Sequence, residues 1–290
     1  MLTVNVPLFS VLIANYNNGE YLLEAIDSIL KQTYKNWEIV IVDDCSIDNS
    51  QQLYKELRLN SKIKIFTNDK NRGCGYTKSR CVAEAKGELC GFLDPDDVLD
   101  LEALEIMTQK HLEQPIHSLI YSTHYEWYSK DLESIRQSNH VGSIPSNKTQ
   151  LTFKGPKISH FASFKKELYL RSGGISPYLR RAVDQDLYFK LEEQGPVLFI
   201  NKPLYYYRQH THGISQGINV PAARLFHLDA IFDAYKRRQN INIDNINFKE
   251  YLNYKIEYQN LIKIRSSSII KHIQCDIKSL LFKILLKVVF

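Results

Sequence analysis

One pattern repeats through the first hundred residues and limits the fold more than any other feature. A short apolar run rich in β-branched residues is followed each time by a segment whose apolar side chains have helical spacing. The apolar runs cover residues 9–14, 37–42, 63–67 and 89–93. Turn-forming residues bound these runs, as expected for buried strands. Strands that alternate with helices predict an α/β fold with a mostly parallel sheet and helices on both faces.

Acidic residues follow two of these predicted strands. Asp43 and Asp44 close the second strand, and residues 94–97 (Asp-Pro-Asp-Asp) follow the fourth. Open α/β sheets bind ligands at the carboxyl ends of their strands, so we expect these acids to lie close together. Carboxylates in such a place suit a hard cation, Mg²⁺ or Mn²⁺. The alternative for each pair is a turn and a helix cap, with Asp97 or Asp100 capping the following helix.

Three further motifs are candidates for chemistry. A glycine-containing turn at 71–75 precedes a basic helix with Lys78 and Arg80, and turn amides at a helix start favour phosphate. Its spacing matches neither the dinucleotide-binding nor the P-loop pattern. Asp184 opens an amphipathic helix, where it is either a general base or a complement to the helix dipole. His210 follows a tyrosine-rich run and is either a ligand to metal or phosphate, or a structural histidine.

The last seventy residues differ in charge from the rest. Residues 221–290 hold twelve Lys and Arg against six Asp and Glu, whereas residues 1–220 hold 25 against 26. We therefore predict an α/β domain over 1–220 and a basic, helical extension over 221–290, with the tract 240–247 as a linker. Because the positive charge belongs to the extension, we expect an anionic partner there and no nucleic acid.

The end of the extension has the pattern of an amphipathic helix. A helix over 269–290 places six large apolar residues on one face: Ile273, Ile277, Leu280, Leu281, Ile284 and Val288. Lysines lie beside this face, which fits a helix lying on an anionic membrane surface. Docking on the domain or on a partner chain is the alternative, and the oligomeric state stays open.

Composition bounds the cellular setting. The five cysteines are odd in number and none has C-x-x-C spacing, so we expect reduced thiols and no structural zinc. The first residues lack a positively charged segment, and no run of 18 apolar residues occurs, so neither a secretory signal nor a membrane-spanning helix is expected. These features predict a cytoplasmic protein, peripheral on the inner face of the cell membrane if the extension binds lipid.

Four segments resemble the family 2 glycosyltransferases, which have the GT-A fold. They are residues 9–17 (FSVLIANYN), 28–34 (SILKQTY), 37–46 (WEIVIVDDCS) and 87–97 (GELCGFLDPDD). Their order and spacing make the resemblance specific, and it covers roughly residues 7–210. The resemblance implies a Rossmann-like GT-A sheet flanked by helices, with the C-terminal extension outside it.

The resemblance also implies roles for the acidic residues. Tyr16 and Asp44 would hold the nucleotide base, with Asp44 accepting from the uracil N–H of a UDP-linked donor. Asp96 would ligate the metal. Asp94 would reach the ribose, or the metal through a bound water, and His210 would be a late ligand to the metal or the diphosphate. Asp184 matches the position of the catalytic base.

The chain departs from the family at three places. Ala14 stands where Thr is frequent, so one base contact is missing. Lys78 stands at the usual Arg position, which leaves the phosphate contact open between Lys78 and Arg80. Val183 replaces a Glu that often precedes the base, and Asp186 is the nearest substitute carboxylate.

The resulting expectation is an inverting, metal-dependent hexosyl- or N-acetylhexosaminyltransferase. It would move a sugar from a nucleotide-diphosphate sugar to a saccharide or a lipid-linked saccharide, in bacterial surface-polysaccharide synthesis. Two other classes stay open. A nucleotidyltransferase also places acids and a metal on an α/β sheet but releases pyrophosphate. A catalytically inactive nucleotide- or sugar-binding module would show no turnover.

Overall fold

The computed structural model describes residues 6–127, 135–155, 157–209, 219–266 and 269–289. Its strands are β1 (Phe9–Asn15), β2 (Trp37–Asp43), β3 (Ile63–Thr67), β4 (Leu89–Phe92), β5 (Val98–Leu99), β6 (Leu119–Trp127), β7 (Arg136–Gln137), β8 (Ala162–Lys165) and β9 (Val197–Arg208). Its helices are α1 (Gly19–Leu30), α2 (Ser50–Leu57), α3 (Cys74–Glu84), α4 (Ala103–Glu113), α5 (Lys166–Arg171), α6 (Val183–Glu192), α7 (Val220–Arg237), α8 (Phe248–Arg265) and α9 (Ile269–Val289).

The strands form one mixed sheet in the order β3-β2-β1-β4-β8-β6-β9-β5, and β7 pairs with β6. The first four neighbours run parallel, as do β6 and β9, whereas β8 is antiparallel to both β4 and β6. The carboxyl ends of β1, β2 and β4 therefore meet at one edge. The expected α/β class with a mostly parallel sheet is confirmed.

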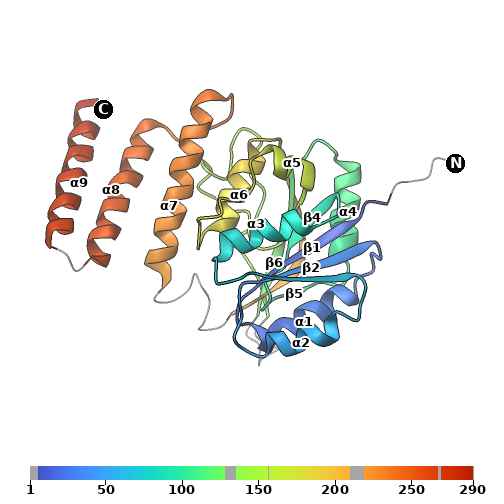
Figure 1. Cartoon of the computed structure of the whole chain (residues 1–290). Coiled ribbons are helices and arrows are strands. Elements are labelled where there is room, and N and C mark those ends of the chain that lie inside the picture. Colours follow the sequence, from blue (N-terminus) through green and yellow to red (C-terminus); the bar gives the residue numbers. More distant parts are fainter. Residues whose placement is uncertain (1–5, 128–134, 156, 210–218, 267–268, 290) are drawn as a thin grey trace.

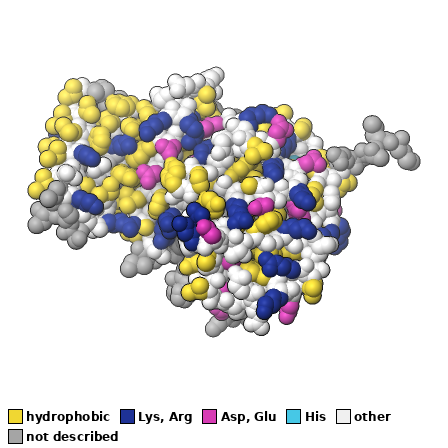
Figure 2. Space-filling model, in the orientation of Figure 1, with side chains coloured by type: hydrophobic (Ala, Val, Ile, Leu, Met, Phe, Trp, Pro, Cys, Tyr) yellow, Lys and Arg dark blue, Asp and Glu magenta, His cyan; other side chains and the backbone are white. Residues whose placement is uncertain are grey.

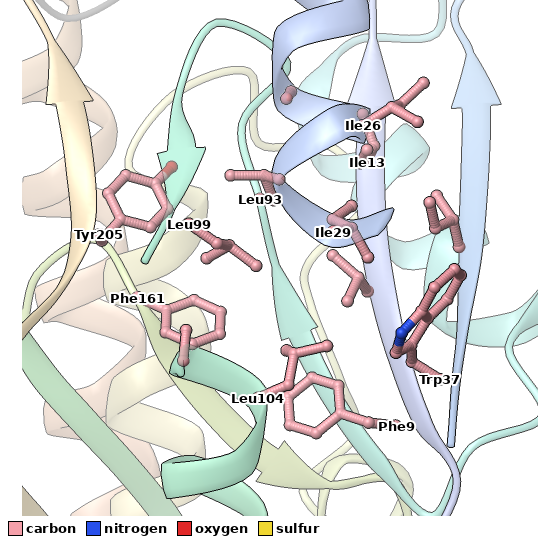
Figure 3. Close-up of a cluster of buried hydrophobic side chains, with 14 of the residues drawn as sticks. Phe9, Ile13, Ile26, Ile29, Trp37, Leu93, Leu99, Leu104, Phe161 and Tyr205 are labelled. Carbon is pink, nitrogen blue, oxygen red and sulfur yellow. The ribbon is translucent and has the colours of Figure 1, made fainter. Parts of the chain in front are cut away.

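Alternation along β1 explains how the two faces of the sheet are covered. Phe9, Val11 and Ile13 point into a cluster with α1, α2 and α4. Figure 3 shows part of this cluster, including Phe9 and Ile13. Leu12 belongs to a second cluster with α3 and α6. Because successive strand residues face opposite ways, a run of apolar residues buries both faces. Figure 1 shows the resulting three layers.

Three long helices extend from one side of this layered part (Figure 1). The first, α7, packs on α6 through a small core that includes Leu151, Phe189, Leu228 and Phe232. The next two, α8 and α9, pack mainly against each other and reach the far end of the molecule. The predicted linker, 240–247, lies between α7 and α8. Its first residue is the last of a short 3₁₀ turn that follows α7. The division at residue 220 stays a prediction.

The alternative role of Asp97 and Asp100 as helix caps does not apply to α4, which begins at Ala103 without a side-chain cap. The Asp100 carboxylate accepts from the Glu102 amide at 3.1 Å, in the turn before the helix. The long strand β9 runs unbroken through Pro203 because the shifts in its register with β6 absorb the interruption. All five cysteines are free thiols, as expected. Within the described part of the chain, no helix has the length and apolar character needed to cross a membrane.

Candidate active site

A cavity of about 1270 Å³ opens where β1, β2 and β4 end. It begins at Ala14 and Asp44, passes Asp94 and Asp184, and reaches Arg265 at the end of α8. Its volume exceeds the roughly 300–1,000 Å³ of an ordinary small-molecule pocket. The cavity is therefore large enough for two substrates side by side.

The first end of the cavity is built on β1 and β2. Ala14 and Tyr16 line it, and Tyr16 is 44% exposed. Asp44 is buried, and its carboxylate accepts from Asn68 Nδ2 and the Arg72 amide, both at 2.7 Å, and from the Gly73 amide at 2.8 Å. Asp44 thus fixes the loop before α3 while lining the cavity. The neighbouring Asp43 does not line it.

Glycine is required where this loop enters α3. Gly73 has φ of 88°, in the region that side chains rarely adopt. Gly75 donates to the Leu179 carbonyl at 2.8 Å, and a Cβ on Gly75 would lie 2.4 Å from that oxygen. The close approach brings α3 against the segment before α6, so that Lys78 and Asp184 meet.

Lys78 contacts two of the acids that line the cavity. Its buried ammonium lies 3.0 Å from Asp94 Oδ1 and 2.9 Å from Asp184 Oδ1, which joins the end of β4 to the start of α6. Burial opposes the charge, but Asp184 and Asp94 outweigh it and hold the pKa of Lys78 well above its ordinary value. A permanent cation therefore stands between the two carboxylates.

The three acids after β4 have different surroundings. Asp94 and Asp96 line the cavity. Asp97 is buried beneath them and accepts from the Tyr205 hydroxyl at 2.6 Å and the Arg208 amide at 2.8 Å. Burial, with Asp96 and Asp94 nearby, raises the pKa of Asp97 well above its ordinary value. Asp97 anchors the acidic turn to β9 and leaves the other two acids facing the cavity.

The donor set fits a hard divalent cation. Asp94 and Asp96 offer carboxylate oxygens from one turn, the ligands that Mg²⁺ and Mn²⁺ prefer. Among the described residues, no group of three or more His, Cys, Asp or Glu side chains gathers closely enough to hold a metal alone. Further ligands would have to come from a substrate, water or the undescribed segment. The predicted ligand His210 lies in that segment, outside the described residues.

Asp184 lies on the first turn of α6, and its side chain is 46% exposed at the cavity. Ala182, the residue before α6, has φ of 55°, a left-handed conformation that is uncommon for alanine and occurs often at functional sites. Asp186 does not offer a second carboxylate to the cavity. It is buried and accepts hydrogen bonds from the Ser176 amide and Lys190 Nζ, both at 2.8 Å.

The structure does not bring Arg80 to the cavity. Its guanidinium donates to the Thr67 carbonyl at 2.9 Å and to Asn68 Oδ1 at 2.7 Å, on the outer side of α3. Of the two basic candidates on this helix, Lys78 is the one that lines the cavity.

The cavity also contains residues that the sequence did not indicate. His160 lines it and stacks on Tyr207, with ring centroids 3.9 Å apart. Burial, with His124 beside it, lowers the pKa of His160 to about 3, so the ring is neutral near pH 7. Arg181 and Arg265 line the far end. The pair Arg180–Arg181 lies close to Asp184 in the sequence and was a local signal for Arg181. Nothing in the sequence pointed to His160 or Arg265.

The chain matches known proteins over most of this region. A family model described as glycosyl transferase family 2 matches residues 10–187. The chain is 30% identical over 200 residues to the chondroitin synthase of Escherichia coli, covering 69% of this chain and 29% of that protein. It is 29% identical over 207 residues to the hyaluronan synthase of Pasteurella multocida, covering 69% and 20%. The chain thus spans less than a third of the length of these relatives.

Solved structures are similar over most of the chain. S. aureus TarS 1–349 in complex with UDP-GlcNAc has a TM-score of 0.65 at 18% identity, covering 88% of this chain and 71% of that one. The mannosyltransferase PcManGT of Pyrobaculum calidifontis, in complex with GDP-Man and Mn²⁺, has a TM-score of 0.60 at 15% identity, covering 98% and 84%. These likenesses confirm the expected GT-A fold.

Proposed function

Because the chain belongs to glycosyl transferase family 2, we propose that it moves a sugar from a UDP-linked donor to a saccharide acceptor, with inversion at the anomeric carbon. The observation that carries this proposal is the line of Asp44, Lys78, Asp94 and Asp184 along one cavity. UDP-GlcNAc in TarS and the names of the synthase relatives favour a hexose or N-acetylhexosamine donor in polysaccharide synthesis.

The donor would occupy the part of the cavity between β1 and α3. Ala14, Tyr16 and Asp44 would hold the base, with the Asp44 carboxylate accepting from the uracil N–H. Lys78 is the buried cation next to the place of the diphosphate. When bound at Asp94 and Asp96, a divalent cation would stabilise the charge that develops on the leaving diphosphate.

Asp184 would act as the general base. Its carboxylate lines the cavity beside Lys78 and Asp94, and an acceptor hydroxyl would approach the anomeric carbon next to it. The hydroxyl oxygen forms the new glycosidic bond, the bond to the diphosphate breaks, and Asp184 takes the hydroxyl proton. A positioned base contributes on the order of 10²–10⁴-fold.

Product analysis tests this function against its rivals. The full chain is incubated with UDP-GlcNAc, UDP-glucose and UDP-glucuronic acid, each with short saccharide acceptors and Mn²⁺. We expect free UDP and a lengthened acceptor with the inverted anomeric configuration. Release of pyrophosphate would instead identify a nucleotidyltransferase. UDP binding without turnover on any pair would identify an inactive binding module.

We also propose that α9 rests on an anionic membrane surface. The six predicted apolar residues are exposed, with values from 47% for Ile284 to 78% for Val288, because α9 packs on α8 through Cys275 and Ser279 instead. Lys271, Lys278, Lys283 and Lys287 are exposed on the same helix. Figure 2 shows hydrophobic side chains with basic ones among them at this end of the molecule. Exposed apolar surface with flanking lysines fits anionic lipid.

Vesicle sedimentation tests the membrane proposal. The double variant Ile277→Asp, Leu281→Asp should lose binding to phosphatidylglycerol-containing vesicles. The matched control, Leu59→Asp with Ile116→Asp, changes two exposed apolar residues of the sheet part and should bind like the unchanged chain. Equal binding by both double variants would contradict the proposal. The proposal would also be contradicted if the unchanged chain did not bind vesicles and formed a dimer that only the α9 variant dissociates.

A further inference from the structure

The far end of the cavity is basic. Beyond Asp184 it is lined by Arg180, Arg181, Arg224 and Arg265, which come from the segment before α6, from α7 and from the end of α8. Figure 2 shows a group of Lys and Arg side chains where α7 approaches the sheet part of the molecule. If the donor occupies the first end, this second end is the acceptor side.

Three of these four arginines have no counter-charge among the described residues. Arg224 forms a bidentate pair with Glu257 at 2.6 and 2.8 Å. Arg180, Arg181 and Arg265, in contrast, have no carboxylate within 4.0 Å in the described part of the chain. The fold thus neutralises Arg224 and leaves the other three without an anion.

Arg181 also has an unsatisfied donor. Its Nη2 donates to Asn219 Oδ1 at 3.0 Å, whereas its Nη1 is buried and has no hydrogen-bond partner in the described part of the chain. Burial, with the charge of Arg265 nearby, lowers the pKa of the Arg181 guanidinium. A buried N–H without a partner costs free energy that a bound acceptor group would recover.

A second groove adjoins Arg265. It has a volume of about 360 Å³ and a mixed lining from α7 and α8, in which Leu225, Phe226 and Ile262 are apolar and Asp229 and Tyr258 are polar. Arg265 and Phe226 line both the groove and the main cavity, so the two spaces are contiguous. The groove reaches Lys271 at the start of α9. An anionic group at Arg265 would therefore have the apolar side chains of this groove beside it.

We propose that Arg181 and Arg265 form an anion subsite that holds a negatively charged group of the acceptor while its hydroxyl faces Asp184. This inference rests on the proposed transferase function. Two unpaired guanidinium groups suit a phosphate or a carboxylate. The adjoining groove favours a phosphate that carries a hydrocarbon chain, as in a lipid-linked saccharide, over the carboxylate of an acidic sugar.

Calorimetric titration of the UDP-saturated full chain tests the subsite, since UDP then blocks the donor end. The probes are geranyl diphosphate, inorganic diphosphate and glucuronic acid. We expect geranyl diphosphate to bind most tightly, and Arg181→Gln and Arg265→Gln each to weaken it about tenfold or more. Arg181→Lys should recover part of the affinity. Arg171→Gln, an exposed arginine on α5, is the matched control and should change nothing.

Each result has a distinct meaning. Preference for glucuronic acid, with the same dependence on Arg181 and Arg265, would keep the subsite and assign it to an acidic sugar. Unchanged probe affinity in both glutamine variants, or no probe binding with UDP still bound, would overturn the subsite alone. Failure to bind UDP would overturn the proposed function; the same titrations without UDP would still decide whether the arginine pair binds anions.

Discussion

At the residue scale, the account depends on the contacts of one buried lysine. Lys78 lies between Asp94 and Asp184, which come from elements ninety residues apart in the chain. A buried ammonium needs such partners, because burying an unpaired charge is costly. The same arrangement holds the two carboxylates in place beside one cation in the lining of the cavity.

The substitution Asp184→Asn tests the base directly. It keeps the size of the side chain and removes the proton acceptor, so transfer should fall by about 10²–10⁴-fold. The Kd for UDP should stay within about threefold, because the base-binding end is formed by β1 and β2. Transfer assays and calorimetry on the same preparation measure both. Near-normal transfer by the variant would remove Asp184 from the catalytic role.

The sequence predicted acids that line the cavity, whose roles stay predictions, and missed much of what surrounds them. Asp44, Asp94 and Asp96 were predictable because the carboxyl ends of parallel strands meet at one sheet edge. His160 and Arg265 were not, because they reach the cavity from segments whose packing has no local pattern. Arg80 was placed on the correct helix, but helical spacing alone did not show that it faces outward.

At the element scale, the apolar runs were sufficient to locate β1 to β4. The antiparallel strand β8 was not predicted, because its four residues have no extended apolar pattern and only their pairing with β4 and β6 defines the strand. The glycines at the start of α3 indicate a turn in the sequence. The structure shows that Gly75 also allows α3 to contact the segment before α6.

Replacing Gly75 with Ala tests that contact. The new Cβ would lie 2.4 Å from the Leu179 carbonyl oxygen, a backbone atom that cannot move alone. We expect a loss of about 1–3 kcal/mol in the free energy of unfolding, measured with urea. UDP affinity should fall as well, since Lys78 lies one turn further along α3.

The matched control is Ala83→Gly, on the exposed side of the same helix. It should lower stability by about 1 kcal/mol through helix propensity alone and leave UDP affinity unchanged. If Gly75→Ala bound UDP like this control, the contact would not position Lys78.

At the scale of the whole molecule, buried histidines predict how stability depends on pH. Burial is the first cause that lowers the pKa of four of them: His111 and His160 to about 3, and His124 and His227 to about 4. Each stays neutral in the fold while its unfolded counterpart protonates below about pH 6.5, so each favours unfolding as the pH falls.

Two buried acids act in the opposite direction. Burial raises the pKa of Glu192 to about 7 and that of Asp97 well above its ordinary value, so both keep protons that the unfolded chain releases. Four histidines outweigh two acids, and the Tm should fall from pH 7 to pH 5. In Glu192→Gln the fall should be steeper. Melting curves across this range test the prediction, and a constant or rising Tm would contradict it.

The helical extension marks the limit of prediction at this scale. The apolar face of α9 was predictable from its helical spacing, and the structure leaves that face exposed. The packing of α7 on α6 was not predictable, because Phe189 and Leu228 meet across distant segments. Through this packing, the extension supplies Arg224 and Arg265 to the cavity, although the predicted boundary separated it from the site.

The central claim is a nucleotide site at the ends of β1, β2 and β4 that includes a metal-binding acid. The most direct test is calorimetric titration of the full chain with UDP, with and without Mn²⁺, beside Asp96→Ala. We predict UDP binding that Mn²⁺ strengthens in the unchanged chain, and no Mn²⁺ effect in the variant. UDP binding that is the same with and without Mn²⁺ and in both proteins, or no binding of UDP or GDP, would contradict the account.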